Sequence, residues 1–275
     1  IEHPSVIEAA PHAQKIPVTK DGVIDIAAFQ KMLAEKPALV CVQLVNSETG
    51  AIQPVAEISK LAKDAGALVL CDAVQAAGRL EIDFKALNVD YMTLSAHKFG
   101  GPQGTGALIF REGLQIPKFL RGGGQEKRQR AGTENVACIA GMGVGAKIAK
   151  AELAQFKTQT RIFQTQLESA LRSVANDIII VSENALRVSN TTNIIFPDVT
   201  AETQVMAMDL DGVAVSSGSA CSSGTFKPSH VLTAMGYSEK QAGSALRFST
   251  GWATTSDEID ETVAAFTRMA ARLKK

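Results

Sequence analysis

The sequence predicts an α/β protein with a mostly parallel sheet and flanking helices, followed by a smaller α+β domain. Three apolar runs, 38–45, 67–71 and 91–94, alternate with segments of helical periodicity. Unbroken apolar runs of this length are typical of strands buried on both faces, as in parallel sheets. The chain has 275 residues and 45% apolar content, which is enough for a sizeable core and one or two domains.

The first elements lead into this sheet. Pro4 suits the first turn of a helix, Asp21-Gly22 predicts a turn, and 26–35 is expected to be helical. The strand 38–45 then ends at the polar loop 46–50. Polar side chains therefore begin where the first strand stops.

The next helix is expected to begin at Pro54 and to end at Gly66. Its apolar residues recur at helical spacing: Val55, Ile58, Leu61 and Ala62. The strands 67–71 and 91–94 follow, and the β-rich run 107–110 comes after the second of them. Strand, helix and strand in alternation indicate parallel pairing through right-handed crossovers.

Several polar residues follow the ends of these strands. Ligands of parallel sheets bind beyond the carboxyl ends of the strands, where such side chains meet. The residues concerned are Asn46, Asp72, Gln75, Ser95, His97 and Lys98. For Asp72 alone, a helix N-cap is an equally good interpretation.

Lys98 lies on a Gly/Pro-rich stretch between two predicted strands. Glycines there let the backbone approach a ligand closely. Ser95 and His97 flank the lysine and are donors suited to a phosphate. A lysine held in such a place can form a Schiff base with a carbonyl compound, although a solvated lysine on a turn fits the local pattern as well.

The segment 121–133 is polar and rich in glycine, which fits either a solvated loop or a contact with a ligand or subunit. A helix is expected over 134–150, and it either continues to about 175 or is followed by a second helix that ends there. The stretch 141–146 matches the dinucleotide fingerprint G-x-G-x-x-A, but no strand precedes it. These glycines therefore predict close helix packing rather than a nucleotide site.

The predicted domains are 1–150, a large ligand-binding domain, and 151–275, a small one. In the small domain we expect strands at 178–181, 192–196 and 246–249 and helices at 201–210, 228–235, 239–244 and 257–273. Cys221 lies in a Ser/Gly loop. Two interpretations fit this position: an exposed thiol that acts as a nucleophile, or a neutral surface cysteine. Arg247 interrupts an apolar strand, which requires an anionic partner: a structural carboxylate or the carboxylate of a substrate.

Composition excludes several classes of function. Lysine plus arginine and aspartate plus glutamate number 28 each, so no basic excess favours nucleic acid. No apolar run approaches the ~20 residues of a membrane span, and the start of the sequence lacks a signal-peptide pattern. The four cysteines are too widely spaced for a CxxC metal or redox site, so we expect no metal and a reducing, cytoplasmic setting.

Six motifs, in this order, resemble the cysteine desulfurases of the NifS/IscS type, which are class V, fold-type I enzymes dependent on pyridoxal 5'-phosphate. They are Asn-x-Glu-Thr-Gly from Asn46, Asp-x-x-Gln from Asp72, Ser-x-His-Lys from Ser95, the segment 121–135, Ser-Ser-Gly-Ser-Ala-Cys ending at Cys221, and Leu-Arg-Phe-Ser around Arg247. The resemblance covers essentially the whole chain. Members of the family also have a long segment before the position of His3, so the resemblance implies an N-terminally incomplete large domain.

The resemblance implies roles for the residues around Lys98, which would hold the cofactor covalently through its amine. Asp72 would pair with the pyridine nitrogen and keep it protonated. Gln75 would bond the ring hydroxyl oxygen, and Ser95 and His97 would bind the phosphate.

It also implies roles for residues elsewhere in the chain. His3 would stack on the cofactor ring and move protons, and Thr133 would reach the phosphate of a partner subunit in a homodimer. Asn46 and Arg247 would hold the carboxylate of the substrate, L-cysteine. Cys221 would take the substrate sulfur as a persulfide.

The implied activity is conversion of L-cysteine to L-alanine, with sulfur delivered from Cys221 to an acceptor or scaffold protein for iron–sulfur cluster assembly or related sulfur trafficking. A selenocysteine lyase or another class V enzyme is one alternative, although an aminotransferase needs no loop thiol. A non-catalytic fragment that binds or dimerises is another.

Overall fold

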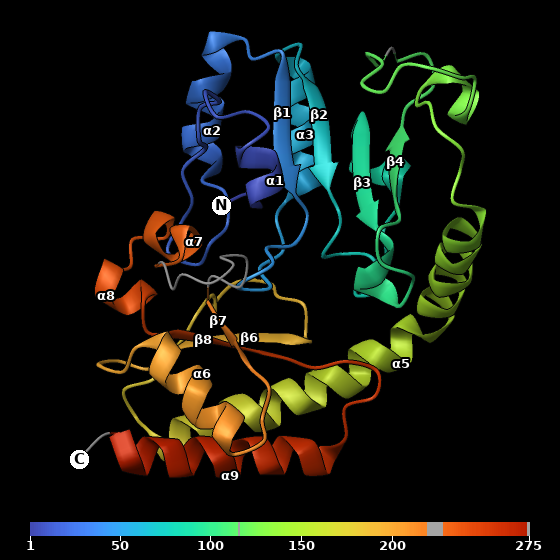
Figure 1. Cartoon of the computed structure of the whole chain (residues 1–275). Helices are drawn as coiled ribbons and strands as arrows, with labels where there is room; N and C mark the ends of the chain where they lie inside the picture. The colour runs from blue at the N-terminus through green and yellow to red at the C-terminus, as the bar shows by residue number, and fades with distance from the viewer. Residues whose placement is uncertain (115, 219–227, 274–275) are drawn as a thin grey trace. The chain divides into compact units, whose positions relative to one another are not determined.

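The computed structural model describes residues 1–114, 116–218 and 228–273, and its packing divides the chain into two compact units (Figure 1). We call the unit of residues 35–44 and 55–153 the lysine unit, because it contains Lys98. We call the unit of residues 1–34, 45–54 and 154–275 the arginine unit, because it contains Arg247. Each unit has its own sheet and is described by itself.

The sheet of the lysine unit has the strand order β1-β2-β3-β4. Strands β1 (Leu39–Gln43), β2 (Leu68–Asp72) and β3 (Tyr91–Ser95) pair in parallel, and β4 (Gly106–Phe110) runs antiparallel to β3. The predicted fold class, a mostly parallel sheet with helices, is therefore confirmed.

One face of this sheet is more deeply buried than the other. Val40 and Val42 of β1 are buried, whereas Leu39 is 45% exposed. Helix α3 (Val55–Asp64) packs on β1 and β2 and contributes Ile58 to the buried face. The apolar runs predicted burial on both faces, but within the described residues the alternating pattern of a half-buried strand appears. The short helix α4 (Phe84–Leu87) follows. The side chain of Asp83 caps its start, and Asn88 ends it with a left-handed backbone conformation.

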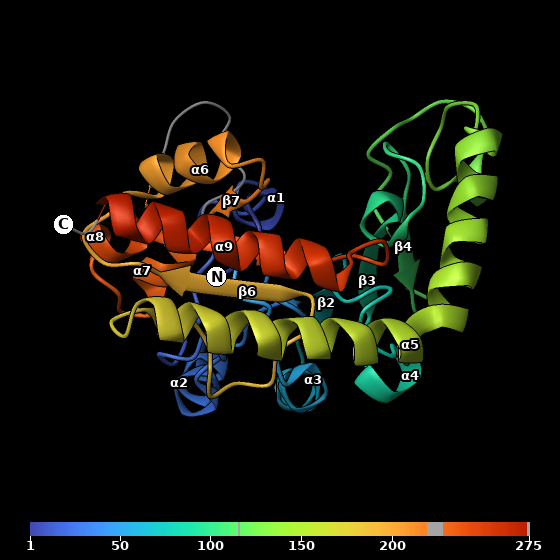
Figure 2. The ribbon, with the colours of Figure 1, turned by 90° about the horizontal axis from the view of Figure 1, so that it is seen from below.

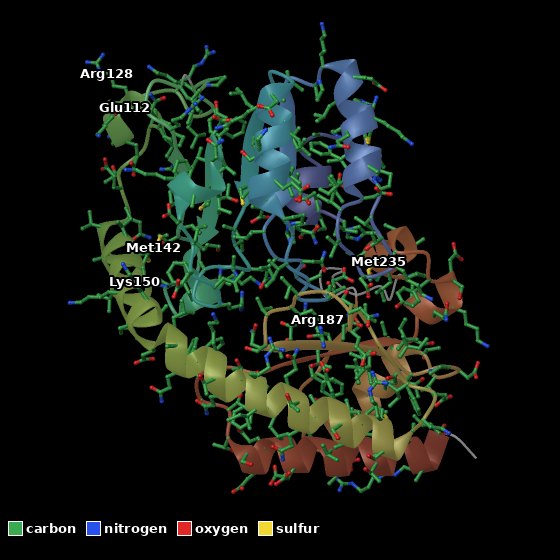
Figure 3. The ribbon with its side chains drawn as sticks, turned by 180° about the vertical axis from the view of Figure 1, so that it is seen from behind. Glu112, Arg128, Met142, Lys150, Arg187 and Met235 are labelled. Carbon is green, nitrogen blue, oxygen red and sulfur yellow. The ribbon has the colours of Figure 1, made fainter. Side chains whose placement is uncertain are left out.

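Helix α5 (Val136–Val174) is one continuous helix of 39 residues, so of the two arrangements that the sequence left open, one helix or two in succession, the structure has the first. Its first part belongs to the lysine unit, where Met142 packs on the cluster of Ala96 and Phe99 while Lys150 points away from it (Figure 3). A Cβ added at Gly145 would lie 3.1 Å from the backbone nitrogen of Gly101. Close packing is therefore confirmed at Gly145, and at Gly141, where an added Cβ would lie 2.7 Å from Pro102 Cγ, but not at Gly143.

The glycines of α5 allow a matched test of this packing. Gly145→Ala should destabilise the fold by about 1–3 kcal/mol, because the new methyl group would press on the Gly101 backbone. Gly143→Ala should stabilise it by about 0.5–1 kcal/mol, since nothing lies within 4 Å of the added Cβ and alanine is the better helix former. Chemical denaturation of both variants measures the difference, and equal effects of the two changes would contradict it.

The sheet of the arginine unit is antiparallel, with the strand order β5-β6-β8-β7. Its strands are β5 (Ile179–Ile180), β6 (Thr191–Ile195), β7 (Ser216–Ser217) and β8 (Ala245–Ser249). The later part of α5 and helix α9 (Ser256–Leu273) lie side by side on one face of it (Figure 2). Phe266 of α9 is at the centre of this core, with its ring centroid 5.4 Å from that of Phe196 and 6.4 Å from that of Phe248.

Shorter elements complete the arginine unit. Asp25 caps the start of α2 by accepting a hydrogen bond from Ala28, Thr200 does the same for α6 through Thr203, and Ser238 and Gln241 form a capping box on α8. The bounds are α1 (Pro4–Ile7), α2 (Ile26–Met32), η1 (Leu33–Glu35), α6 (Ala201–Leu210), α7 (His230–Ala234) and α8 (Glu239–Ala242).

The two compact units comprise other residue ranges than the predicted domains 1–150 and 151–275. The division within α5 falls between Leu153 and Ala154, near the predicted boundary, but residues 1–34 and 45–54 pack with the C-terminal part of the chain. Compact units need not be independently folding domains, so the domain boundaries stay a prediction. Among the described helices, none combines the length and apolarity needed to cross a membrane.

Candidate active site

Lys98 lies on a short 3₁₀-helix, η2 (Ala96–Phe99), between β3 and β4. The sequence predicted a tight loop here, and the structure adds this helical turn. Gly100 ends it in the left-handed region, at φ 87°, and donates its N–H to the carbonyl of Ala96. Ala96 and Phe99 are buried beside Ala77, so the turn that carries the lysine is anchored in the core.

Two glycines keep the strands on either side of this turn close together. A Cβ at Gly106 would lie 2.6 Å from the carbonyl oxygen of Leu94, and one at Gly101 would lie 2.8 Å from the Cβ of Ala96. Both positions therefore require glycine. These two glycines of the Gly/Pro-rich stretch therefore allow close packing of the backbone around Lys98.

Asp72 ends β2, and its side chain is held in place by two donors. The Oδ1 atom accepts hydrogen bonds from the backbone N–H of Val74 at 2.9 Å and from the Thr93 hydroxyl at 3.3 Å. Residues after Asp72 form turns rather than a helix, so the carboxylate is no helix N-cap. Thr93 is the register partner of Asp72 on β3, and sequence reasoning missed it because it lies inside an apolar run.

The remaining predicted residues of the lysine unit lie at the same edge of the sheet or follow it. Ser95 Oγ and His97 Nδ1 are 2.8 Å apart, which joins the two predicted phosphate donors. Gln75 Oε1 accepts a hydrogen bond from Arg79 Nη1 at 2.7 Å. Thr133 is exposed in the segment before α5, and its predicted contact with a partner subunit stays a prediction.

The predicted residues of the arginine unit centre on the loop after β1, residues 46–50. Arg247 Nη1 donates to the carbonyl of Ser47 at 2.8 Å. Asn46 is buried, and its Oδ1 accepts from the N–H groups of Glu48 and Thr49 at 2.9 and 3.0 Å. Asn46 Nδ2 donates to the carbonyl of Ile1 at 3.1 Å. Asn46 is thus part of the loop that Arg247 contacts, and its side chain fixes the conformation of that loop.

Residues 186–188, far along the chain, pair with the end of the same loop at residues 50–52. Ile52 donates its N–H to the carbonyl of Leu186 at 2.8 Å, and Val188 donates to Gly50 at 3.0 Å. Between them, Arg187 forms a β-bridge with Ala51.

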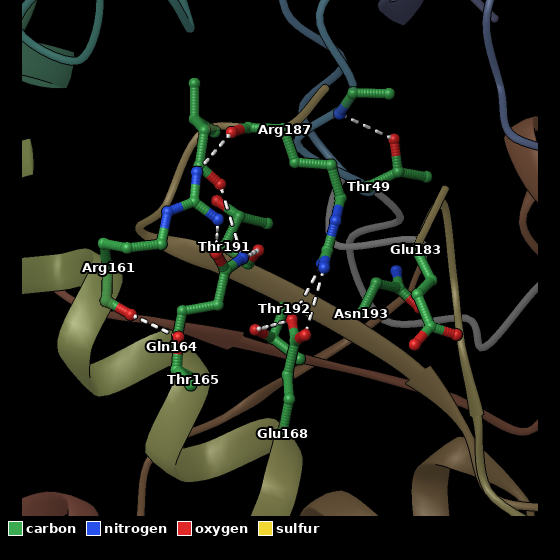
Figure 4. Close-up of polar contacts among 12 residues, drawn as sticks. Thr49, Arg161, Gln164, Thr165, Glu168, Glu183, Arg187, Thr191, Thr192 and Asn193 are labelled. Carbon is green, nitrogen blue, oxygen red and sulfur yellow. Dashed lines mark hydrogen bonds and ion pairs between the residues drawn. The ribbon is translucent and has the colours of Figure 1, made fainter. Parts of the chain in front are cut away.

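The guanidinium of Arg187 is buried against α5 (Figure 4). Its Nη1 and Nη2 atoms make a two-point ion pair with the Glu168 carboxylate at 2.8 and 3.0 Å, and the Thr192 hydroxyl donates to the same carboxylate at 2.9 Å. This network connects the loop to α5 and β6.

Glu48 is a residue that sequence reasoning quoted within a motif but did not single out. It is 6% exposed, and its Oε2 accepts a short hydrogen bond from the Ser229 hydroxyl. Burial raises the pKa of the Glu48 carboxyl from 4.5 to about 7, against the opposing effects of the Ser229 hydrogen bond and the Arg247 guanidinium. Nothing in the local sequence signals this burial, because Ser229 and Arg247 are distant in the chain.

The last two predicted residues are His3 and Cys221. His3 caps α1: its Nδ1 accepts the N–H of Ser5 at 3.2 Å and lies 2.8 Å from the Ser5 hydroxyl. Its role at a cofactor stays a prediction, because His3 belongs to the arginine unit and Lys98 to the lysine unit. Cys221 lies outside the described residues.

Comparisons with known proteins agree on one family. Residues 2–262 match the family described as Aminotransferase class-V. The chain is 36% identical over 283 residues to a cysteine desulfurase of Sinorhizobium fredii, with 100% of this chain and 73% of the relative covered. It is also 36% identical over 281 residues to the cysteine desulfurase NifS of Azotobacter vinelandii, with 100% and 70% covered. Among solved structures, a NifS-like protein from Rickettsia africae superposes with a TM-score of 0.91 at 36% identity, covering 98% of this chain and 74% of that one.

Proposed function

The chain belongs to the class V aminotransferase family, and we propose from this premise that it is a cysteine desulfurase, which converts L-cysteine to L-alanine. The resemblance inferred from the motifs is thereby confirmed, and so is the cofactor, since cysteine desulfurases of this family depend on pyridoxal phosphate. The observation that carries the proposal is that Asp72 and Lys98 follow neighbouring parallel strands at one edge of one sheet.

The residues at this edge fit the chemistry of pyridoxal phosphate. An aldehyde needs an amine, which Lys98 supplies on a turn anchored by the buried residues Ala96 and Phe99. A phosphate needs hydrogen-bond donors, which Ser95 and His97 offer side by side. A pyridine nitrogen that carries a proton needs an anion, and Asp72 is oriented by Val74 and Thr93.

When bound, pyridoxal phosphate supplies an electrophilic carbon for the substrate amine and a ring that withdraws electrons from the substrate Cα. We assign three tasks to the chain's own residues. Asp72 holds the proton at the pyridine nitrogen, Lys98 Nζ removes the proton from the substrate Cα, and Arg247 with the loop of Asn46 binds the substrate carboxylate.

We assign the sulfur transfer to Cys221. Its thiolate attacks the substrate sulfur, an S–S bond forms, and the bond between the substrate Cβ and its sulfur breaks. The electron pair of the broken bond stays with the substrate Cβ, which takes up a proton and becomes the methyl group of alanine. The two sulfurs are oxidised as they join, and Cys221 is left as a persulfide. Atoms balance, because L-cysteine and one protein thiol give L-alanine and one protein persulfide.

Further parts of the proposal concern the setting of the enzyme. We propose a cytoplasmic homodimer in which Thr133 reaches the cofactor phosphate of the partner subunit and His3 contacts the cofactor ring. A sulfur-acceptor protein then receives the persulfide sulfur, for iron–sulfur cluster assembly or a related sulfur pathway. The names NifS and IscS among the relatives support this direction.

The test is release of alanine and sulfide from L-cysteine by the chain supplied with pyridoxal phosphate and a thiol reductant. Cys221→Ala should abolish release of both, because the substrate sulfur then has no acceptor. Cys138→Ala, which changes a half-buried thiol on α5, should leave both rates unchanged. If Cys221→Ala retained the parent rate, the assignment of the nucleophile would be wrong. If selenide were released from L-selenocysteine far faster than sulfide from L-cysteine, the chain would instead be a selenocysteine lyase.

A further inference from the structure

The loop after β1 contains a buried carboxylic acid to which no role has been given so far. We propose that Glu48 is a positioning residue that acts through Arg247 and regulates how strongly this guanidinium binds the carboxylate of the amino-acid substrate. The inference rests on the proposed function, because it takes Arg247 as the carboxylate-binding residue. It concerns the arginine unit only.

The backbone of the loop is tied to both members of one register pair of the sheet. Asn193 on β6 and Arg247 on β8 lie opposite each other. Arg247 Nη1 donates to the carbonyl of Ser47, and Asn193 Nδ2 donates to the carbonyl of Glu48 at 3.1 Å. Asn193 and Glu48 are both buried. Glu48 therefore has a fixed place next to the residue whose carbonyl the guanidinium binds.

The side chain of Glu48 is held from another element. The Ser229 hydroxyl donates to Glu48 Oε2 and accepts the N–H of Leu232 at 3.1 Å at the start of α7. Ser229 is fully buried. The carboxyl thus cannot turn to solvent without breaking a buried hydrogen bond, and its charge acts on its protein neighbours with little screening.

The charged neighbours of Glu48 come from several elements. Arg247 on β8 favours ionised Glu48. Burial lowers the pKa of His230 on α7, which disfavours the charged form of this imidazole. Glu2, Lys15 and His3 interact with His230.

The sign of the coupling follows from these charges. Ionised Glu48 partly neutralises Arg247 and repels a second carboxylate, so the substrate binds more strongly when Glu48 is protonated. A bound anion removes the favourable effect of Arg247 on ionised Glu48 and therefore raises the pKa of Glu48 further. The Kd for an amino-acid carboxylate should rise as the pH passes upward through about 7.

The experiment measures the Kd of L-alanine, the product, for the holoenzyme between pH 6 and pH 9, together with KM and kcat for L-cysteine. We expect the parent Kd and KM to rise by up to about tenfold over this range through Glu48, the effect of one pKa unit of coupling. Glu48→Gln should keep the low-pH affinity throughout, because the amide carries no charge. Glu261→Gln on α9, an exposed position in the same unit, is the matched control and should keep the parent slope.

Two further variants separate regulation from a merely structural role. Ser229→Ala removes a hydrogen bond that lowers the pKa of Glu48, so the midpoint of the Kd transition should move to higher pH. Glu48→Asp keeps the charge and should restore a pH-dependent Kd, whereas Glu48→Gln does not. All variants retain His3 and His230, so differences between them report on Glu48.

The outcomes distinguish a failure of the role proposed for Glu48 from a failure of the proposed function. If Glu48→Gln retained the pH slope of the parent, or if Ser229→Ala left the midpoint in place, the inference would be overturned and the proposed function would stand. A parent holoenzyme that neither bound L-alanine nor turned over L-cysteine would overturn the proposed function, and the inference with it. A change confined to kcat, with KM and Kd independent of Glu48, would also contradict the inference.

Discussion

Lys98→Ala should abolish covalent attachment of pyridoxal phosphate and lower turnover of L-cysteine on the order of 10³-fold or more, as expected for loss of both the attachment point and the base. Alanine fits the 3₁₀-helix η2, whose buried residues Ala96 and Phe99 are unchanged. The fold should therefore persist. Borohydride reduction followed by mass spectrometry of the peptide that contains residue 98 measures the attachment directly, independently of activity.

Lys85→Ala provides the control in the same unit, because Lys85 is exposed on the short helix α4. It should leave both attachment and turnover at the parent level. Cofactor found on another lysine of the parent chain, with Lys98 unmodified, would refute the assignment. Loss of attachment in both variants would point to damage of the lysine unit rather than to a specific role of Lys98.

Removing either partner of the buried ion pair between Arg187 and Glu168 should cost about 3–5 kcal/mol of unfolding free energy. The side chains of Arg187 and Glu168 are only 7% and 16% exposed, so a partner left alone keeps its charge in a poorly hydrated place. Arg187 also lies within the segment that pairs with residues 50–52. Glu168→Ala and Arg187→Ala, compared by chemical denaturation, measure the cost.

The double change Arg187→Met with Glu168→Leu should cost much less than either single change, because it leaves no unpaired charge. The exposed pair of Lys240 and Asp198 serves for comparison, and Lys240→Ala should change stability little. If Glu168→Ala were no more destabilising than Lys240→Ala, the ion pair would contribute little to holding the loop. Equal losses in the single and double variants would show that packing, rather than charge, dominates there.

Local patterns in the sequence predicted the elements, and contacts between distant residues account for what they missed. The apolar runs located β1, β2 and β3, and periodicity predicted helix α3 and the closing helix α9. Such signals lie within one segment, so they can be read without knowledge of the rest of the chain. The 3₁₀ turn that carries Lys98 was missed because four residues are too few to show a period.

The candidate site was predictable as a set of residue types but not as a set of contacts. Asp72 and Lys98 were singled out because polar residues at the carboxyl ends of parallel strands share an edge. Thr93 and Ser229 were missed, because a hydroxyl in an apolar run or before a helix is common. Glu48 was quoted within a motif, but its burial results from contacts with Asn193 and Ser229 far along the chain.

The turn that carries Lys98 has a consequence for cofactor affinity. The turn follows β3 directly and is joined to β4 by residues 100–105, and its first and last residues, Ala96 and Phe99, are in the core. The conformational entropy of this backbone is therefore lost when the chain folds rather than when a ligand arrives. Attachment of the cofactor aldehyde at Lys98, as we propose, then has to order little more than the lysine's own methylene chain, so most of the binding free energy remains available as affinity.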